Sequence, residues 1–186
     1  MALLIFAVLS LLVASELQAG VVVGGTRFIF PADRESISIS LTNTSQDSWL
    51  INSKINRPTR WAGDEASTVP APLLAAPPLI LLKPGTTGTL RLLRTESDIL
   101  PVDRETLFEL SIASVPSGKV ENQSVKVAMR SVFKLFWRPE GLPGDPLEAY
   151  QQLRWTRNSQ GVQLTNPTPY YINLIQVSVN GKALSN

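Results

Sequence analysis

The sequence contains no cysteine and no histidine, and these two absences exclude much of enzyme chemistry. Without cysteine the chain has no disulfide and no thiolate nucleophile. Without histidine it cannot build a Ser-His-Asp or Cys-His nucleophile system, and it lacks the usual ligand sets for zinc and iron. No paired carboxylates stand in a context that suggests acid–base catalysis. We therefore expect no enzyme activity, no catalytic residue, no metal, no cofactor and no small-molecule substrate.

Basic residues are too few and too scattered for a nucleic-acid-binding surface. The 17 Lys and Arg against 15 Asp and Glu give a formal net charge of +2, and no run of Lys or Arg exceeds two residues. We therefore expect no nucleic-acid partner. Asp103 and Glu105, which flank Arg104, are typical of a charged turn.

Long apolar runs are also missing, except at the amino end. The segment MALLIFAVLSLLVASELQAG has an apolar core from Leu3 to Ala14. This core is too short for a comfortable membrane span and matches the hydrophobic part of a secretory signal peptide, although the usual basic residues after Met1 are absent. Ala19 before Gly20 fits a cleavage site. The sequence predicts a signal peptide over residues 1–19 and export of the remainder.

What the sequence does contain is a succession of short strand patterns. In residues 36–43 the alternation places Ile37, Ile39 and Leu41 on one face. Two glycines within residues 21–30 predict a bend or bulge, and the Pro/Ala-rich stretch 61–78 predicts a loop or an irregular edge. Seven strand candidates separated by turn signals predict an immunoglobulin-like β-sandwich: 21–30, 36–43, 49–57, 79–85, 89–94, 106–116 and 124–137.

After the Pro- and Gly-rich segment RPEGLPGDP (138–146) the strand pattern restarts. Residues 153–157, 161–166 and 170–179 are strand candidates, and Asn180-Gly181 is a strong hairpin signal. The residues that remain are fewer than the roughly 80–100 that a sandwich takes. The predicted fold is all-β, with an immunoglobulin-like domain over residues 20–138 and an incomplete second β-sandwich domain over residues 139–186.

Four motifs in order along the chain resemble one protein family: GGTRFIF at 24–30, LPVDRETLFELSIASVP at 100–116, RSVFKLFWRPEGL at 130–142 and NPTPYYINL at 166–174. They are similar to motifs of the periplasmic chaperones of the chaperone–usher pathway, which assemble bacterial pili. Glu109 and Ser111 depart from the pattern, since the family often has an aromatic residue and Asn there. NPTPYY itself is typical of a turn with a structural role.

The resemblance implies that the chain binds pilus or fimbrial subunits and delivers them to an outer-membrane usher. A subunit of this kind is an immunoglobulin-like domain that lacks its last strand, and the chaperone lends a strand of its own to the open groove. By alignment, Val125, Val127 and Met129 are the side chains that fill the groove. Their spacing alone is also compatible with a row that faces this protein's own core.

The resemblance further implies that Arg27 and Lys134 bind the carboxylate at the subunit's C-terminus. It also implies that Glu105 and Arg138 belong to an interdomain ion pair, which in relatives includes an Asp of the second domain. Two charge-assisted hydrogen bonds to a chain end would fix the register of the added strand. Lys134 has the opposite parity to Met129, so a regular strand points it to the other face. A bulge near residues 130–132, or a cleft reached from the other face, would reconcile the two roles.

Two other functions are compatible with the sequence: a secreted structural or adhesive pilus protein, and a truncated chaperone copy that no longer functions. The absence of cysteine argues against a pilus subunit, because subunits of this kind usually carry a disulfide. The amino end also resembles the first strand of a chaperone rather than the alternating apolar extension of a subunit.

Overall fold

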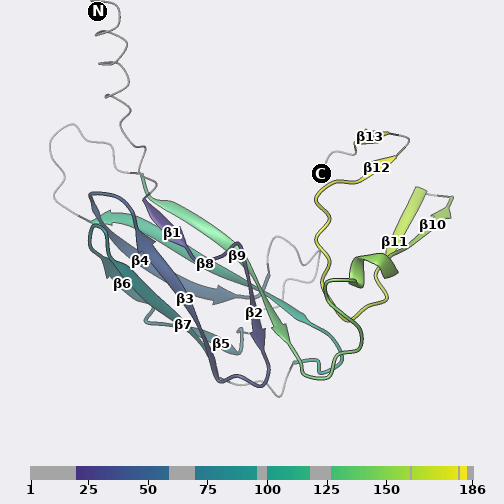
Figure 1. Cartoon of the computed structure of the whole chain (residues 1–186), viewed down its shortest axis with the longest axis horizontal. Helices are drawn as coiled ribbons and strands as arrows, with labels where there is room; N and C mark the ends of the chain where they lie inside the picture. Colours follow the sequence, from purple (N-terminus) through teal and green to yellow (C-terminus); the bar gives the residue numbers. More distant parts are fainter. Residues whose placement is uncertain are drawn as a thin grey trace, which may run out of the picture.

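The computed structural model of the chain describes residues 20–58, 70–95, 100–117, 127–159, 161–179 and 181–183. Within them, nine strands form two sheets (Figure 1). The four-stranded sheet has the order β1 (Val21–Val23), β3 (Ser36–Asn43), β7 (Thr87–Arg94) and β5 (Leu73–Ala76). The five-stranded sheet has the order β2 (Arg27–Pro31), β9 (Met129–Arg138), β8 (Thr106–Ser117), β4 (Ser48–Asn56) and β6 (Leu79–Leu82).

The core lies between the two sheets and follows from the alternation of apolar side chains. On β3 and β7, Ile39 and Leu90 are register partners, and both are buried. Ile51 on β4 and Leu110 on β8 are fully buried in the same cluster. Removing these alternate side chains from water is what holds the two sheets together. The all-β prediction for this region is confirmed.

The predicted strand 21–30 divides into β1 and β2, which belong to different sheets. The chain crosses between the sheets at Gly24-Gly25, where the prediction placed a bend or bulge. A Cβ atom at Gly24 would overlap the side chain of Ser40, so the crossing takes a residue without a side chain.

The Pro/Ala-rich stretch differs from its prediction. Residues 73–76 form β5, a short edge strand paired with β7, and Leu73 and Ala75 point into the core. The prediction of a loop or irregular edge missed this strand, because only two alternate side chains carry its pattern. Residues 59–69 of the same stretch lie outside the described residues.

Strand β9 pairs with β8 in an unbroken antiparallel register, from Met129 opposite Ser114 to Trp137 opposite Thr106. No bulge interrupts this register, so odd-numbered and even-numbered side chains of β9 stay on opposite faces. Leu135 and Trp137 are buried in the core on one face. Lys134 therefore points to the outer face of the five-stranded sheet, and the cleft that it would serve lies on that face.

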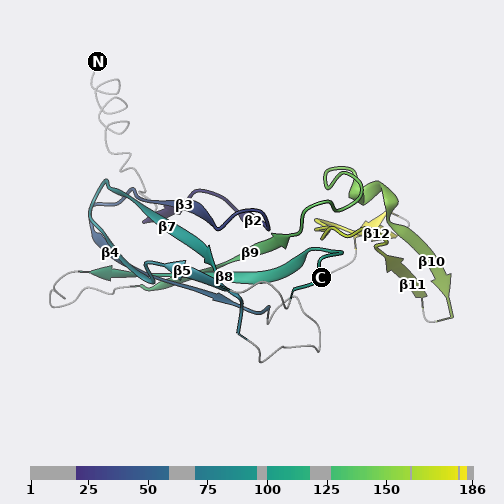
Figure 2. The same ribbon diagram turned by 90° about the horizontal axis from the view of Figure 1, so that it is seen from below.

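The part of the chain after β9, here called the second region, contains little regular structure. A 3-10 turn (Ala149–Gln152) precedes a two-stranded ribbon of β10 (Arg154–Asn158) and β11 (Gly161–Thr165). A second ribbon pairs β12 (Ser178–Val179) with β13 (Lys182–Ala183), and Gly181 has the positive φ of 77° that a tight hairpin needs. Figure 2 shows these ribbons at the opposite end of the molecule from most of the sandwich.

The predicted strand 170–179 is wrong except at its last two residues, because the structure has no strand between Tyr170 and Val177. The start of this segment instead forms hydrogen bonds with the sandwich and with the Pro- and Gly-rich segment 138–146, here called the linker.

No helix among the described residues has the length and apolar character needed to cross a membrane. Residues 1–19, the predicted signal peptide, lie outside the described residues.

Candidate functional site

Arg27 and Lys134 lie side by side on the outer face of the five-stranded sheet. Strands β2 and β9 run parallel, and the first residue of β2, Arg27, is the register partner of Lys134. Arg27 is exposed, and its guanidinium makes no hydrogen bond or ion pair with another described residue. The Nζ of Lys134 donates a hydrogen bond to Oδ1 of Asn173, which belongs to the second region. Two cations from distant parts of the sequence thus meet at one point.

The aromatic residues around Lys134 divide between the two faces of the sheet. Phe133 and Trp137 pack on the core side, and Trp137 stacks on Phe30 with ring centroids 5.4 Å apart. Phe136 shares the outer face with Lys134 and is buried. Glu109, a departure from the family pattern, is the register partner of Lys134 on β8 and is also buried. Glu109 is not among the site residues that the resemblance implies.

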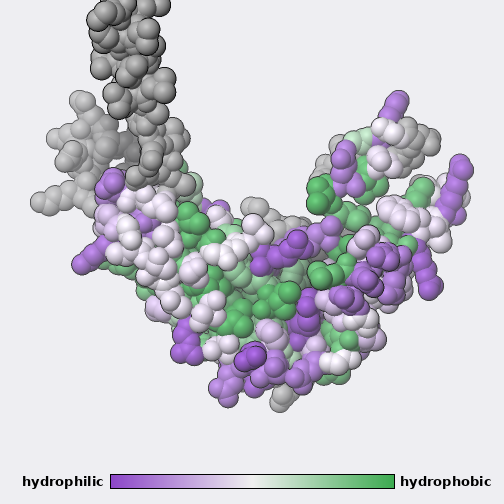
Figure 3. Space-filling model, viewed as in Figure 1, coloured by the Kyte–Doolittle hydropathy of each residue, from purple (hydrophilic) through white to green (hydrophobic). Residues whose placement is uncertain are grey.

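A cavity of about 320 Å³, here called the junction cleft, lies between the outer face of the sheet and the second region. The sandwich side of its lining consists of Arg27, Ile29, Glu105, Phe136 and Arg138. The other side consists of Pro146, Leu147, Tyr170, Tyr171 and Asn173. In the space-filling view the sandwich and the later ribbons are two lobes with a hollow between them (Figure 3). The predicted cations therefore lie at a junction of two parts of the chain.

Glu105 connects β9 to the second region. Its Oε1 accepts a hydrogen bond of 2.7 Å from Nε of Arg138, and its Oε2 accepts one of 2.7 Å from the backbone N–H of Tyr171. The backbone N–H of Glu105 also donates to the carbonyl oxygen of Pro169. Glu105 is only 4% exposed, whereas the prediction treated its neighbourhood as a charged turn. That description fits Asp103 and Arg104, which form an exposed pair.

Asp103 and Glu105 have different surroundings, because Asp103 is largely exposed and Glu105 is buried. A hydrogen bond from the Arg104 side chain lowers the pKa of Asp103 on the surface. At the junction cleft, burial raises the pKa of the Tyr171 phenol. Tyr171 packs on Phe136 with ring centroids 5.5 Å apart. The cleft thus has an aromatic wall, with the cations Arg27 and Arg138 along its lining.

The NPTPYY motif forms the turn that brings the second region to the sandwich. Asn166 accepts hydrogen bonds from the backbone N–H and the hydroxyl of Thr168, and its Nδ2 donates to the carbonyl oxygen of Tyr170 at 2.7 Å. The Tyr170 hydroxyl lies 3.1 Å from the carbonyl oxygens of Leu142 and Gly144. Arg138 lies over the Tyr170 ring, 5.3 Å from its centroid.

Of the remaining predicted residues, Met129 begins β9 and Val127 lies two residues before it. Strand β2 pairs only with Lys134–Arg138, so among the described residues no strand pairs with Met129–Phe133 on the side away from β8. Met129 is 48% exposed and Val127 is 63% exposed. Neither is sealed in the core, and Met129 is the first residue of this open backbone edge. Val125, the third residue of the predicted row, lies outside the described residues.

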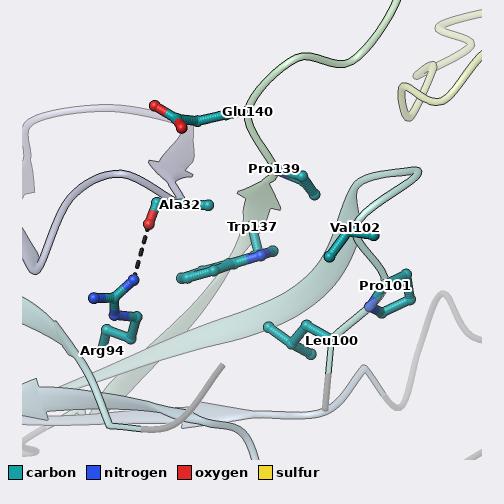
Figure 4. Close-up of a pocket in the computed structure, with 8 residues that line it drawn as sticks. All are labelled: Ala32, Arg94, Leu100, Pro101, Val102, Trp137, Pro139 and Glu140. Atoms are coloured by element: carbon teal, nitrogen blue, oxygen red, sulfur yellow. Dashed lines mark hydrogen bonds between the residues drawn. The ribbon is translucent and has the colours of Figure 1, made fainter. Parts of the chain in front are cut away.

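A second cavity, of about 360 Å³, lies at the end of the sandwich around Trp137 (Figure 4). Leu100, Pro101 and Val102 form one wall, and Arg94, which donates a hydrogen bond of 3.0 Å to the carbonyl oxygen of Ala32, lies on the opposite side. None of the predicted site residues lines this cavity. Among the described residues, no three Asp or Glu side chains gather as metal ligands.

Comparison with known proteins identifies the family. The profile described as "Pili and flagellar-assembly chaperone, PapD N-terminal domain" matches residues 20–143, and "Pili assembly chaperone PapD, C-terminal domain" matches residues 148–186. The chain belongs to the family of pilus-assembly chaperones. This family is one of chaperones and not a class of enzymes, and the resemblance drawn from the four motifs is confirmed.

Several members of this chaperone family are similar over most of the chain. The fimbrial chaperone YcbF of Escherichia coli K12 is 97% identical over 186 residues, which are 100% of this chain and 79% of YcbF. The chaperone FimC of the same strain is 31% identical over 182 residues, covering 96% of this chain and 73% of FimC.

Solved structures of pilus-assembly chaperones share the fold. The structure of the Salmonella enterica SafA pilin in complex with the SafB chaperone matches with a TM-score of 0.76 and 31% identity, covering 92% of this chain and 79% of the matched chain. The YadV chaperone structure matches with a TM-score of 0.71 and 32% identity, covering 89% of this chain and 76% of that chain. The immunoglobulin-like fold class is therefore confirmed.

Proposed function

We propose that this fimbrial chaperone works in the periplasm, where it captures pilus subunits by lending them β9. The proposal depends on one observation, the incomplete pairing of β9. Its first half has an open backbone edge with Val127 and Met129 exposed beside it, and its second half begins where Lys134 meets Arg27. A strand edge with free N–H and C=O groups pairs readily with another chain. The SafB relative is known in complex with a pilin, which supports a pilin partner.

In the proposed complex, alternate side chains of the strand enter the subunit's groove. Val127 and Met129 have the same parity, and Val125 continues the row by sequence. Burying each side chain would contribute about 1.5–3 kcal/mol before the cost of ordering is counted. Arg27 and Lys134 bind the carboxylate at the end of the subunit, with the fork of the arginine and the ammonium of the lysine as donors.

The junction cleft supports the same proposal, because Glu105 and Arg138 fix the second region next to the two cations. We propose that residues 20–138 form the strand-lending domain, that residues 139–186 belong to a second domain, and that residues 1–19 are a signal peptide for export. The limits of the two matched profiles, 143 and 148, fall close to the proposed boundary.

Delivery to an outer-membrane usher needs a second surface that stays open while β9 is occupied. Leu81, Leu50 and Val115 form a row across β6, β4 and β8 on the outer face, and they are 54%, 38% and 43% exposed. A contiguous exposed apolar row of this kind is typical of a protein-binding surface. It lies on strands other than β9, so it remains available to a usher.

The capture step is tested by co-expressing the tagged chain in the E. coli periplasm with a panel of E. coli K12 fimbrial subunits. We expect at least one subunit to be retained, and both Arg27→Ala and Lys134→Ala to weaken retention by ten-fold or more. Charge-assisted hydrogen bonds are worth about 1.5–3 kcal/mol each, which corresponds to a loss of this size. Lys54→Ala, an exposed lysine on β4 of the same sheet, is the matched control.

Capture that persists undiminished in both variants would contradict the carboxylate-binding role of Arg27 and Lys134. Retention of no subunit by the wild-type chain would contradict strand donation itself and would favour the non-functional copy. Circular dichroism of each variant checks that the fold is intact.

A further inference from the structure

Asn173 is the point at which the second region contacts one of the two cations. Its Oδ1 accepts the hydrogen bond from Nζ of Lys134, and the residue lines the junction cleft together with Arg27. Lys134 belongs to the sandwich, so this hydrogen bond joins the two regions at the proposed binding site. Sequence reasoning did not select Asn173, which lies just beyond the NPTPYY motif.

Contacts that do not involve Lys134 fix the backbone close to Asn173. Two residues earlier, the N–H of Tyr171 donates to Oε2 of Glu105 at 2.7 Å, and the Tyr171 ring packs on Phe136. These contacts attach the backbone two residues before Asn173 to the sandwich independently of Lys134. Asn173 can therefore position the Lys134 ammonium and does not depend on Lys134 alone for its own place.

The chemistry of an amide suits the task of orienting a lysine. A lysine side chain is a flexible stem that carries a compact charge, and holding it in one position costs rotamer entropy. The carbonyl oxygen of Asn173 accepts a hydrogen bond from the ammonium without neutralising it. A carboxylate at this position would instead pair with Lys134 and compete with an incoming carboxylate.

Other charged groups also face this part of the molecule. Glu109 on β8 and Arg27 on β2 are the two register partners of Lys134. Glu105 and Arg138 lie further along the same cleft. Because Glu109 already supplies one negative charge next to Lys134, a second one at position 173 would offset the positive charge that a chain end needs.

We infer that Asn173 is a positioning residue for the subunit's C-terminus: it holds the Lys134 ammonium at the junction cleft before the subunit arrives, and its neutrality reserves that charge for the incoming carboxylate. The inference rests on the proposed function. It adds a residue of the second region to the proposed binding site and gives that region a direct part in recognition.

The first test needs no subunit. Lysine-labelled protein is studied by NMR, with the Cε signal of Lys134 assigned by its disappearance in Lys134→Arg. In Asn173→Ala we expect the order parameter of this Cε group to fall, because its hydrogen-bond acceptor is removed. In Asn173→Asp we expect the order parameter to stay high, because a carboxylate oxygen still accepts the hydrogen bond from the ammonium. Gln163→Ala and Gln163→Glu, on the exposed strand β11, are the matched controls.

An unchanged Lys134 signal in Asn173→Ala would overturn the inference. The same signal change in the Gln163 controls would also overturn it, since the effect would then not depend on the contact.

The second test uses the E. coli K12 subunit that the wild-type chain retains most strongly in the co-expression panel. We expect Asn173→Ala to weaken retention three- to ten-fold and Asn173→Asp to weaken it more than ten-fold. In a Lys134→Ala background, Asn173→Ala should have no further effect, because its role passes through the lysine. A merely structural role would weaken retention equally in both backgrounds, and that result would overturn the inference.

Failure of the proposed function has a different signature, namely a wild-type chain that retains no subunit. The NMR experiment still decides in that case whether Asn173 holds Lys134.

Discussion

The two halves of β9 have the same backbone conformation and opposite surroundings. Residues 134–138 pair with β2 on one side, and residues 134–137 also pair with β8 on the other. Leu135, Phe136 and Trp137 among them are buried. Among the described residues, 129–133 pair only with β8, and Met129 is half exposed. One continuous strand thus serves both as part of the core and as an unfilled edge. The comparison teaches that burial changes along a single element, and in the proposed function the two halves divide stability from binding.

The largest expected effect comes from the closed half. Leu135 is fully buried and is the register partner of Phe108, which is also fully buried. Leu135→Ala removes core volume and leaves a cavity, so we expect the free energy of unfolding to fall by about 2–5 kcal/mol. Urea unfolding followed by tryptophan fluorescence measures this change. Leu135→Met, which conserves volume, should cost less than about 1.5 kcal/mol; equal losses in the two variants would contradict core packing as the cause.

An intermediate effect is expected where the closed half joins the second region. Glu105→Gln keeps the shape of the side chain, but an amide can accept only one of the two hydrogen bonds that Arg138 and Tyr171 donate. We expect the free energy of unfolding to fall by about 1–3 kcal/mol. Amide hydrogen exchange at Tyr171 should accelerate, which unfolding data alone would not reveal.

The neighbouring exposed pair provides the control for Glu105. Asp103→Asn removes a carboxylate that also bonds to an arginine, but both side chains are largely exposed, so we expect no measurable change in stability. Similar losses from Asp103→Asn and Glu105→Gln would show that burial of Glu105 does not set its contribution.

The smallest effect on stability is expected from the open half. Met129→Ala should change the free energy of unfolding by less than about 0.5 kcal/mol, as for an ordinary exposed residue. Retention of a subunit should fall about five- to ten-fold, because the side chain is buried only in the complex. Unfolding and co-expression of the same variant measure the two quantities. A large loss of stability with unchanged retention would reverse the roles assigned to the two halves.

Local patterns were enough to predict the strands whose side chains alternate. Residues 36–43 form β3 as predicted, because Ile39 and Leu41 face the core and the residues between them face outward. The alternation of apolar side chains wrongly predicted a strand at residues 170–179, because Tyr170 and Tyr171 make other contacts than strand pairing. Their rings and backbone bind the linker and the sandwich, and no property of the local sequence distinguishes such contacts from strand pairing.

The candidate site was predictable only through the resemblance to a family. Arg27 and Lys134 are far apart in the sequence, and parallel pairing of β2 with β9 cannot be derived from either local pattern. Glu109 and Asn173 were missed, because each contributes through a neighbour that only the folded chain supplies. The sequence left open whether a bulge or a cleft on the other face reconciles Lys134 with Met129, and the unbroken register of β9 excludes the bulge.

The start of β2 limits the length and the orientation of any strand that pairs with the open edge of β9. Strand β2 runs parallel to β9 and pairs with its edge from Lys134 onward. A subunit strand that pairs with the same edge of β9 must therefore end where β2 begins. Only a visitor running the same way as β9 would bring its last residue to Arg27. In the proposed complex, β2 therefore blocks the added strand from extending past Lys134. A subunit whose C-terminal strand is a few residues too long would clash with β2, so the chaperone would select subunits by the length of this strand as well as by its terminal carboxylate.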